Sequence, residues 1–265
     1  MEILGYFLAA LVGISLGLIG SGGSILMVPI LVYIFAYNPV LATSYSLFIV
    51  GSTSLVGAFN NYRKGLVSIK TALLFGLSSV TTVFITRHYI MPRIPDVLFS
   101  IGNITVKHDL ATMVLFAVLM LMASFAMIRE GNKSTVAEIN ATSADTIKLL
   151  LFGILVGLTT GFLGAGGGFL IIPALVLILK IPMKKAVGTS LLIIALNSLI
   201  GFTGDLSHID INWKFLASIS LIAVAGIFIG GAFAKKIPAQ KLKKAFGWFV
   251  LVMGIYIIIK ELFFS

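Results

Sequence analysis

The sequence predicts an all-α polytopic membrane protein made of two inverted repeats of about five membrane segments each. Of its 265 residues, 59% are hydrophobic and only 11% are charged, with a mean hydropathy of +1.12. A soluble domain of this size cannot cover so much apolar surface. Residues 17–32 (GLIGSGGSILMVPILV) recur almost in full as residues 161–176 (GFLGAGGGFLIIPALV). A repeat that keeps four glycines and a proline in register indicates two halves of similar build.

The apolar segments form two series of five. They fall at about 3–19, 25–36, 40–59, 66–86 and 109–128, and again at about 147–163, 168–179, 186–203, 213–234 and 245–260. The second member of each series has about 12 residues, or roughly 18 Å of helix, whereas a full crossing needs nearer to ~20 residues. These short pieces contain Pro29 and Pro173 at matched positions. They are half-helices, arms of a returning hairpin, or spans of a locally thin region, and we expect them to meet near mid-membrane.

The basic residues decide how the chain threads through the membrane. Most of the 19 lysines and arginines fall in four clusters, at 63–70, 129–148, 180–185 and 235–244. Cytoplasmic loops carry such an excess. All four clusters share one side only if each glycine-rich segment enters the membrane and returns, and both termini then lie outside. Each half has an odd number of crossings, so the second half is inverted. Five crossings per half, and three crossings plus a re-entrant hairpin, fit equally well.

This threading divides the chain into a first transmembrane repeat at 1–128, a cytoplasmic linker at 129–146 and a second transmembrane repeat at 147–265. The linker is polar, mixed in charge and without apolar periodicity. The stretch 87–108 is expected to be an external loop, with or without a short surface helix. The net charge of +10 is assigned to the cytoplasmic loops. The lipid bilayer is therefore the expected large partner, and nucleic acid is not. A homo-oligomer is left open.

The two glycine-rich breaks are the predicted binding site. Each precedes a short helix, so backbone N–H groups and the positive end of a helix dipole point into the gap, which favours an anion. A helix-packing motif of small residues is the alternative. The residues concerned are Gly20, Ser21, Gly22, Gly23 and Ser24 in the first half, and Gly164, Ala165, Gly166, Gly167 and Gly168 in the second.

Polar side chains on the following long segments extend this predicted site. Thr43 and Ser44 match Thr189 and Ser190, where each long segment opens. They either cap the helix or donate hydrogen bonds to a bound oxyanion. Near mid-span, Ser52 in the first half compares with Asn197 and Ser198 in the second. Such side chains face the bundle interior, either as contacts between helices or as site lining.

The ionisable residues argue against several other functions. The nine acidic residues and three histidines are all expected in loops or at span ends, including a solvated external cluster of Asp205, His208 and Asp210. No buried carboxylate is then available for a proton relay or a cation site, and no catalytic, nucleotide-binding or metal motif is present. We expect no enzyme activity, metal or cofactor. Because a negative cell interior favours the exit of anions, the pattern suits an exporter of small anions better than an accumulator.

The duplicated GLIGSGGSILMVP and GFLGAGGGFLIIP segments, each followed by a short proline-containing helix and then Ala/Gly-Thr-Ser, resemble the sulfite exporter TauE/SafE family of membrane permeases. The resemblance covers about residues 4–262. It implies a secondary transporter in the cytoplasmic membrane for sulfur-containing anions such as sulfite or organosulfonates. It also implies that the glycine breaks and the Thr-Ser pairs line the site. An importer of the same anions, an anion channel and a non-transporting assembly factor remain as alternatives.

Overall fold

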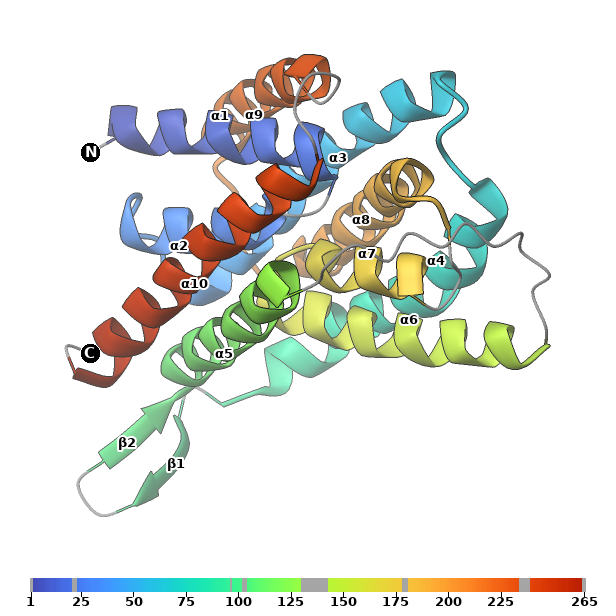
Figure 1. Ribbon diagram of the computed structural model, residues 1–265. Helices are drawn as coiled ribbons and strands as arrows, with labels where there is room; N and C mark the ends of the chain where they lie inside the picture. The colour runs from blue at the N-terminus through green and yellow to red at the C-terminus, as the bar shows by residue number, and fades with distance from the viewer. Residues whose placement is uncertain are drawn as a thin grey trace.

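The computed structural model describes residues 2–20, 23–95, 97–101, 104–129, 143–177, 181–233 and 239–263. Within these ranges the chain forms ten α-helices (Figure 1). They are α1 (Glu2–Ile19), α2 (Ser24–Tyr33), α3 (Pro39–Arg63), α4 (Ile69–Ile85), α5 (His108–Arg129), α6 (Ser143–Leu163), α7 (Gly168–Leu177), α8 (Met183–Asp205), α9 (Trp213–Phe233) and α10 (Ala239–Phe263). Each helix coincides with one predicted apolar segment. The helical character of these segments is therefore confirmed, and their grouping into two inverted repeats of five stays a prediction.

Four of the described helical segments are long and apolar enough to cross a membrane. They are Pro39–Arg63, Ile69–Arg93, Met183–Asp205 and Trp213–Phe233. The described helices also expose large apolar side chains on their outer faces, among them Leu77 at 73% and Leu221 at 70%. Contact between such apolar faces and water is unfavourable, whereas contact with the lipid chains of a bilayer is not.

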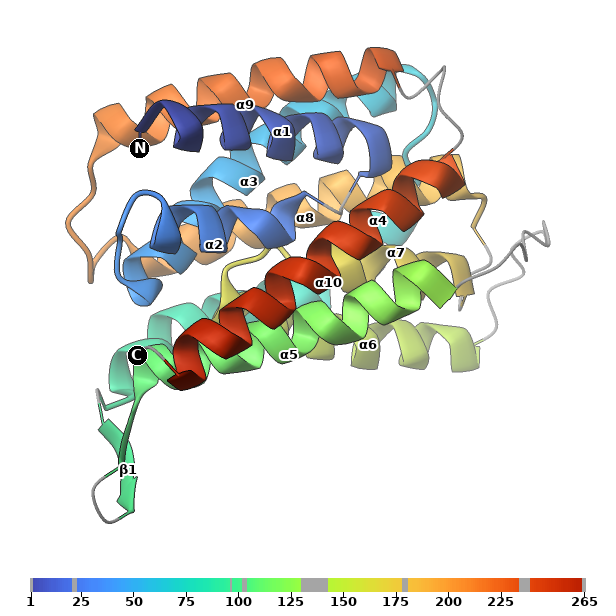
Figure 2. The same cartoon turned by 60° about the vertical axis from the view of Figure 1, so that its left-hand side comes forward.

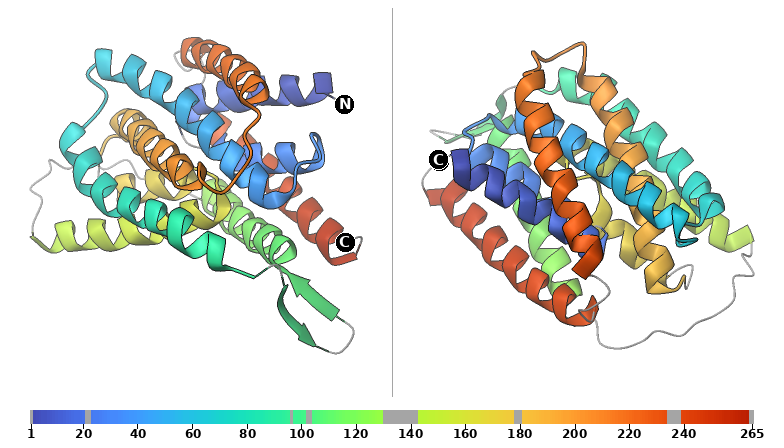
Figure 3. Two further views of the ribbon diagram at one scale, coloured as in Figure 1. Left: turned by 180° about the vertical axis from the view of Figure 1, so that it is seen from behind. Right: turned by 90° about the horizontal axis from the view of Figure 1, so that it is seen from above.

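Helices α3 and α8 run side by side through the middle of the bundle (Figure 3). Gly51 of α3 lies against Leu199, and Gly201 of α8 lies against Leu47. Gly188, near the start of α8, lies against Asn61, near the end of α3. The two helices are therefore antiparallel, so each end of the pair combines the start of one helix with the end of the other.

Glycine-rich faces bring four other helices together. Helix α1 packs along α9, where Gly13 and Gly17 meet backbone atoms of Ala223 and Ile227. Helix α6 packs along α4 in the same way, through Gly153 and Gly157. These small-residue spacings allow the close helix approach that is typical of membrane bundles. Helices α5 and α10 pack against each other as a separate pair (Figure 2).

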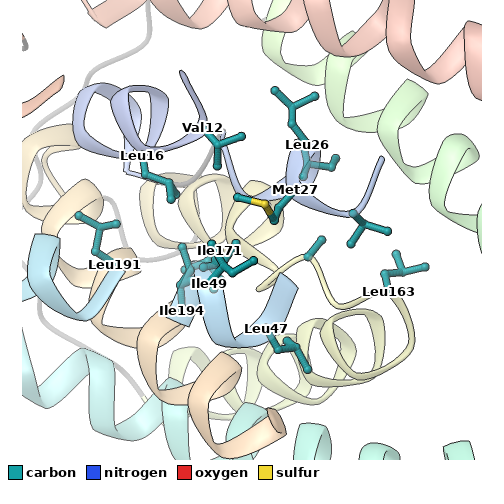
Figure 4. Close-up of a cluster of buried hydrophobic side chains, with 14 of the residues drawn as sticks. Val12, Leu16, Leu26, Met27, Leu47, Ile49, Leu163, Ile171, Leu191 and Ile194 are labelled. Carbon is teal, nitrogen blue, oxygen red and sulfur yellow. The ribbon is translucent and has the colours of Figure 1, made fainter. Parts of the chain in front are cut away.

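The short helices α2 and α7 contact each other inside the bundle. Helix α2, which contains Pro29, runs back toward the end of the bundle at which α1 begins (Figure 2). Met27 of α2 and Ile171 of α7 belong to the same cluster of fully buried side chains as Ile49 and Ile194 (Figure 4). The described contact between the short helices is therefore apolar.

The ends of the helices fall into two groups (Figure 2). The ends that flank the four basic clusters lie together: the last turns of α3, α5 and α9 and the first turns of α4, α6, α8 and α10. We call this the basic end. Both chain termini lie at the opposite end (Figure 2).

The segment between α4 and α5 differs from the predicted external loop. Helix α4 continues into a π-helical turn, η1 (Thr86–Ile90), and a short 3₁₀ turn, η2 (Met91–Arg93). An antiparallel hairpin of β1 (Val97–Ile101) and β2 (Ile104–Lys107) follows, with Ile101 paired to Ile104. Two runs rich in β-branched residues around a Gly-Asn pair favour such a hairpin. The hairpin takes the place of part of the predicted loop, while the described fold otherwise consists of helices, as predicted.

Candidate functional site

The two glycine breaks lie at opposite ends of the α3–α8 pair. Gly20 has a φ of +85° and packs against Val187 in the first turns of α8. Gly164 has a φ of +66° and packs against the backbone of Thr43 in the first turns of α3. A Cβ at either position would overlap its neighbour. Because α3 and α8 are antiparallel, the two contacts are separated by most of the length of α3, roughly 27 Å between Thr43 and Asn61 at ~1.5 Å per residue.

The other residues of the breaks are buried where the structure describes them. Gly166, with a φ of +67°, lies against Val50, Ile194 and the hydroxyl of Ser198. Gly167 lies against the Thr160 hydroxyl. The remaining buried members are Gly23, Ser24, Ala165 and Gly168. Ser21 and Gly22 fall outside the described residues.

Asn197 and Ser198 place hydrogen-bond donors in the centre of the bundle. Both side chains are fully buried on α8. The side-chain oxygen of Asn197 accepts a hydrogen bond of 2.8 Å from Ser79 Oγ of α4. Because an amide has one acceptor and one donor group, this bond directs the amide oxygen toward Ser79 and the amide nitrogen away from it. Asn197 Nδ2 and Ser198 Oγ have no partner among the described residues. With Gly166 against Ser198, the break of the second half reaches these donors.

Thr43 and Ser44 do not cap α3, which corrects the capping alternative. The N-cap is Asn38, whose side chain accepts the Leu41 N–H at 2.8 Å. Thr43 and Ser44 lie one turn further on and are buried. Their hydroxyls contact Arg87 instead, with Nη1 donating to Thr43 Oγ1 at 3.1 Å and to Ser44 Oγ at 3.3 Å.

Arg87 and Asp205 form a buried ion pair beside these hydroxyls. Arg87 Nη1 lies 3.1 Å from Asp205 Oδ2, and Ser44 Oγ donates to the same carboxylate oxygen. Arg87 is only 1% exposed, and Asp205 is also buried. We call Thr43, Ser44, Arg87 and Asp205 the arginine cluster. It lies where α3 begins, α8 ends and the second glycine break makes its contact at Gly164.

The arginine cluster overturns two sequence predictions, that Asp205 is solvated and that the bundle contains no buried carboxylate. Asp205 is not part of a solvated loop, because it forms the last residue of α8 and is held by Arg87 and Ser44. Reasoning from the sequence missed both charged residues. A signal was present at Arg87, since apolar residues stand on both sides of it, at Ile85 and at Ile90 and Met91. Asp205 carries no comparable signal, because its partner is 118 residues away in the chain.

The matched residues in the second half have different surroundings. Thr189 Oγ1 accepts the backbone N–H of Ser68, at the start of α4, at 2.9 Å. Ser190 Oγ donates to Val187 O within its own helix, and the half-buried Ser52 does the same to Ile49 O. Neither Thr189 nor Ser190 forms an N-cap, since α8 is preceded by Pro182 without a side-chain cap. The structure therefore places the predicted site residues at three levels along α3 and α8, and Gly20 and Gly164 do not meet in the single paired site that the sequence predicts.

A cavity of about 300 Å³ opens at the basic end. It lies between α1, α3, α8 and α9, and its polar lining comes from Asn60, Asn61, Lys64 and Lys184. Its wall also includes Gly17 of the duplicated segment and Val187, the contact of Gly20. Two lysines in one cavity wall attract anions. The cavity volume is at the lower end of the range for small-molecule sites.

Comparison with known proteins points in one direction. A family profile described as "Sulfite exporter TauE/SafE" matches residues 6–257. A "Probable membrane transporter protein" of Xylella fastidiosa is 32% identical over 252 residues, which cover 94% of this chain and 91% of the relative. The "Probable membrane transporter protein YdhB" of Bacillus subtilis is 27% identical over 239 residues, or 89% of this chain and 91% of that protein. No solved structure matches the chain.

Proposed function

The chain belongs to the sulfite exporter TauE/SafE family of membrane transporters, and we propose that it exports small sulfur-containing anions such as sulfite or organosulfonates. The observation that carries the proposal is the buried donor group formed by Asn197 Nδ2 and Ser198 Oγ beside Gly166. Buried N–H and O–H groups without acceptors are costly, and an anion that supplies acceptor oxygens offsets that cost.

The proposed transport mechanism uses two inverted halves, 1–128 and 147–265. The helix contacts support this relation, because exchanging the halves reproduces them. The contact of α1 with α9 corresponds to that of α6 with α4, and α3 with α9 corresponds to α8 with α4. The contacts α3–α8, α5–α10 and α2–α7 each correspond to themselves. Rocking of one half against the other would expose a central site alternately to the two sides.

The proposed orientation places the basic end in the cytoplasm. Its lysines would then follow the general bias of cytoplasmic loops, and the cavity with Lys64 and Lys184 would collect anions from inside the cell. A membrane potential that is negative inside favours anion exit by about 2.3 kcal/mol per charge per 100 mV. Export therefore needs no separate coupling group in this mechanism.

The experiment that tests the function uses purified full-length protein with sulfite as ligand. We expect saturable binding by calorimetry and saturable sulfite counterflow in proteoliposomes. Asn197→Asp keeps the shape of the side chain but places a negative charge beside the anion. At a separation of ~5 Å and an effective dielectric constant of ~20, the repulsion is roughly 3 kcal/mol, more than a hundredfold in Kd. Ser198→Ala removes one donor and should weaken binding about tenfold.

Three results would contradict the proposal. Wild-type protein that is folded but binds neither sulfite nor an organosulfonate would remove the anion site. Single-channel currents without counterflow would assign the protein to the alternative class of anion channels. Uptake in place of efflux, with the same binding residues, would instead favour the importer.

A further inference from the structure

The guanidinium of Arg87 is held firmly inside the bundle. The π-helical turn that carries it follows α4 directly, and Thr86 Oγ1 donates to Thr82 O at 2.8 Å in the same turn. Gly204 of α8 lies against the Arg87 Cβ, where a larger residue would displace the side chain. With 1% of its surface exposed, Arg87 exchanges almost no hydrogen bonds with bulk water. Its N–H groups therefore depend on fixed partners.

The side-chain hydrogen bonds that Arg87 makes with described residues all use the same nitrogen. Nη1 contacts Thr43 Oγ1, Ser44 Oγ and Asp205 Oδ2, so its two hydrogens already face three acceptors. Nε and Nη2 are buried and have no partner among the described residues. A guanidinium carries five N–H groups, so three of them are left on these two nitrogens. A buried charged donor without an acceptor costs more than a neutral one.

Nε and Nη2 lie on one edge of the guanidinium and direct two parallel N–H groups outward. This fork matches two oxygens of one anion. From the proposed anion transport, we infer that this edge of Arg87 binds the transported oxyanion at the end of the bundle opposite the basic end. The ligand class is an anion with at least two oxygens on one atom, such as a sulfonate, sulfite or a carboxylate. A neutral sulfone has similar oxygens but lacks the charge.

Asp205 has a defined role in this arrangement. Its Oδ2 receives Nη1 and the Ser44 hydroxyl, so the carboxylate lies on the side of the guanidinium away from the free edge. It offsets the arginine charge when no anion is bound, and it repels a bound anion. An arginine without such a neighbour would hold the anion too tightly for rapid release. The pair therefore binds the anion with moderate affinity. A transporter requires this because it must also release its substrate.

The test measures methanesulfonate binding by calorimetry on detergent-purified full-length protein, with dimethyl sulfone as the uncharged control ligand. Arg87→Lys keeps the positive charge beside Asp205 but removes the fork, and we expect Kd to rise on the order of tenfold or more. Asp205→Asn removes the repelling charge, and we expect Kd to fall severalfold. Thermal unfolding of each variant without ligand reports whether it is folded. Dimethyl sulfone should bind to none of them.

The outcomes separate this inference from the proposed function. If Arg87 and Asp205 form only a structural pair, both variants lose thermal stability and neither changes Kd, which overturns the inference. If Arg87→Lys binds like wild type while Ser198→Ala binds more weakly, the anion site is central and Arg87 is not part of it. If no variant or wild type binds methanesulfonate or sulfite, the proposed function itself fails. Opposite shifts in Kd for Arg87→Lys and Asp205→Asn support the inference.

Discussion

At the scale of single residues, the buried polar side chains named above either have a defined hydrogen-bond partner or carry a donor without a partner among the described residues. An ion pair in a low-dielectric interior repays its desolvation only with further hydrogen bonds. Ser44 Oγ donates one to Asp205, and Thr43 Oγ1 accepts one from Arg87. The matched Thr189 has no charged neighbour of this kind and accepts the Ser68 N–H instead. The same Thr-Ser sequence thus serves an ion pair in one half and a helix start in the other.

Ser79 is the residue that fixes the orientation of Asn197, and it gives a prediction at this scale. Its hydroxyl donates to Asn197 Oδ1, which leaves Nδ2 as the free donor. Ser79→Ala removes this bond and lets the amide rotate, so we expect sulfite Kd to rise about three- to tenfold in calorimetry. Ser78→Ala is the matched control, because the hydrogen bond of Ser78 Oγ within the described part of the chain stays in its own helix, at Phe75 O. Equal effects of the two substitutions would contradict a positioning role for Ser79.

At the scale of helices, close approach through glycine holds the outer pairs together. Lipid chains are as apolar as leucine, so burial alone does not bring helices together in a membrane. On α9, Gly226 meets the carbonyl of Ala10, and Gly230 meets that of Ile14. A Cβ added to Gly231, the next residue, would instead point toward the cavity, where the nearest atom would be Asn60 Nδ2 at 3.9 Å. Adjacent glycines on one helix therefore have opposite packing requirements.

This difference predicts opposite effects for two neighbouring substitutions. Gly230→Ala forces the Cβ into the Ile14 carbonyl, and we expect it to destabilise the protein by about 1–3 kcal/mol. Gly231→Ala has room for its methyl group and gains up to ~1 kcal/mol of helix propensity. Thermal unfolding in detergent should therefore show a lower Tm for Gly230→Ala and an unchanged or higher Tm for Gly231→Ala. A common decrease in both variants would contradict the close contact of α1 and α9.

Local sequence patterns predicted the helices well and the contacts between them poorly. Apolar length and the glycine breaks located α2 and α7 because those features are encoded within a few neighbouring residues. The hairpin was missed although its Gly102-Asn103 pair is a local signal. The Arg87–Asp205 pair depends on the antiparallel packing of distant helices, and no local pattern specifies it. The position of Arg87 and Asp205 at the ends of apolar spans therefore predicts solvated side chains, whereas both are buried.

At the scale of the whole molecule, polar groups lie at three successive positions along α3 and α8. The cavity with Lys64 and Lys184 lies at the basic end. The unpartnered donors of Asn197 and Ser198 lie near the middle of α8, and Arg87 lies near its end. Buried apolar side chains such as Met27, Ile49 and Ile194 form a cluster inside the same bundle (Figure 4). An anion that moves between weak sites of this kind avoids a single deep energy well.

The proposed direction of this path depends on which end faces the cytoplasm, and the chain allows a direct test because it contains no cysteine. Lys184→Cys introduces one thiol at the exposed start of α8, and Val97→Cys introduces one on β1, where Val97 is 48% exposed. A membrane-impermeant maleimide applied to intact cells should label Val97→Cys only. Lys184→Cys should react after the membrane is opened, because lysine-rich loops stay inside. Labelling of Lys184→Cys alone in intact cells would contradict the proposed orientation and would place the lysine-lined cavity outside, where it could not collect anions for export.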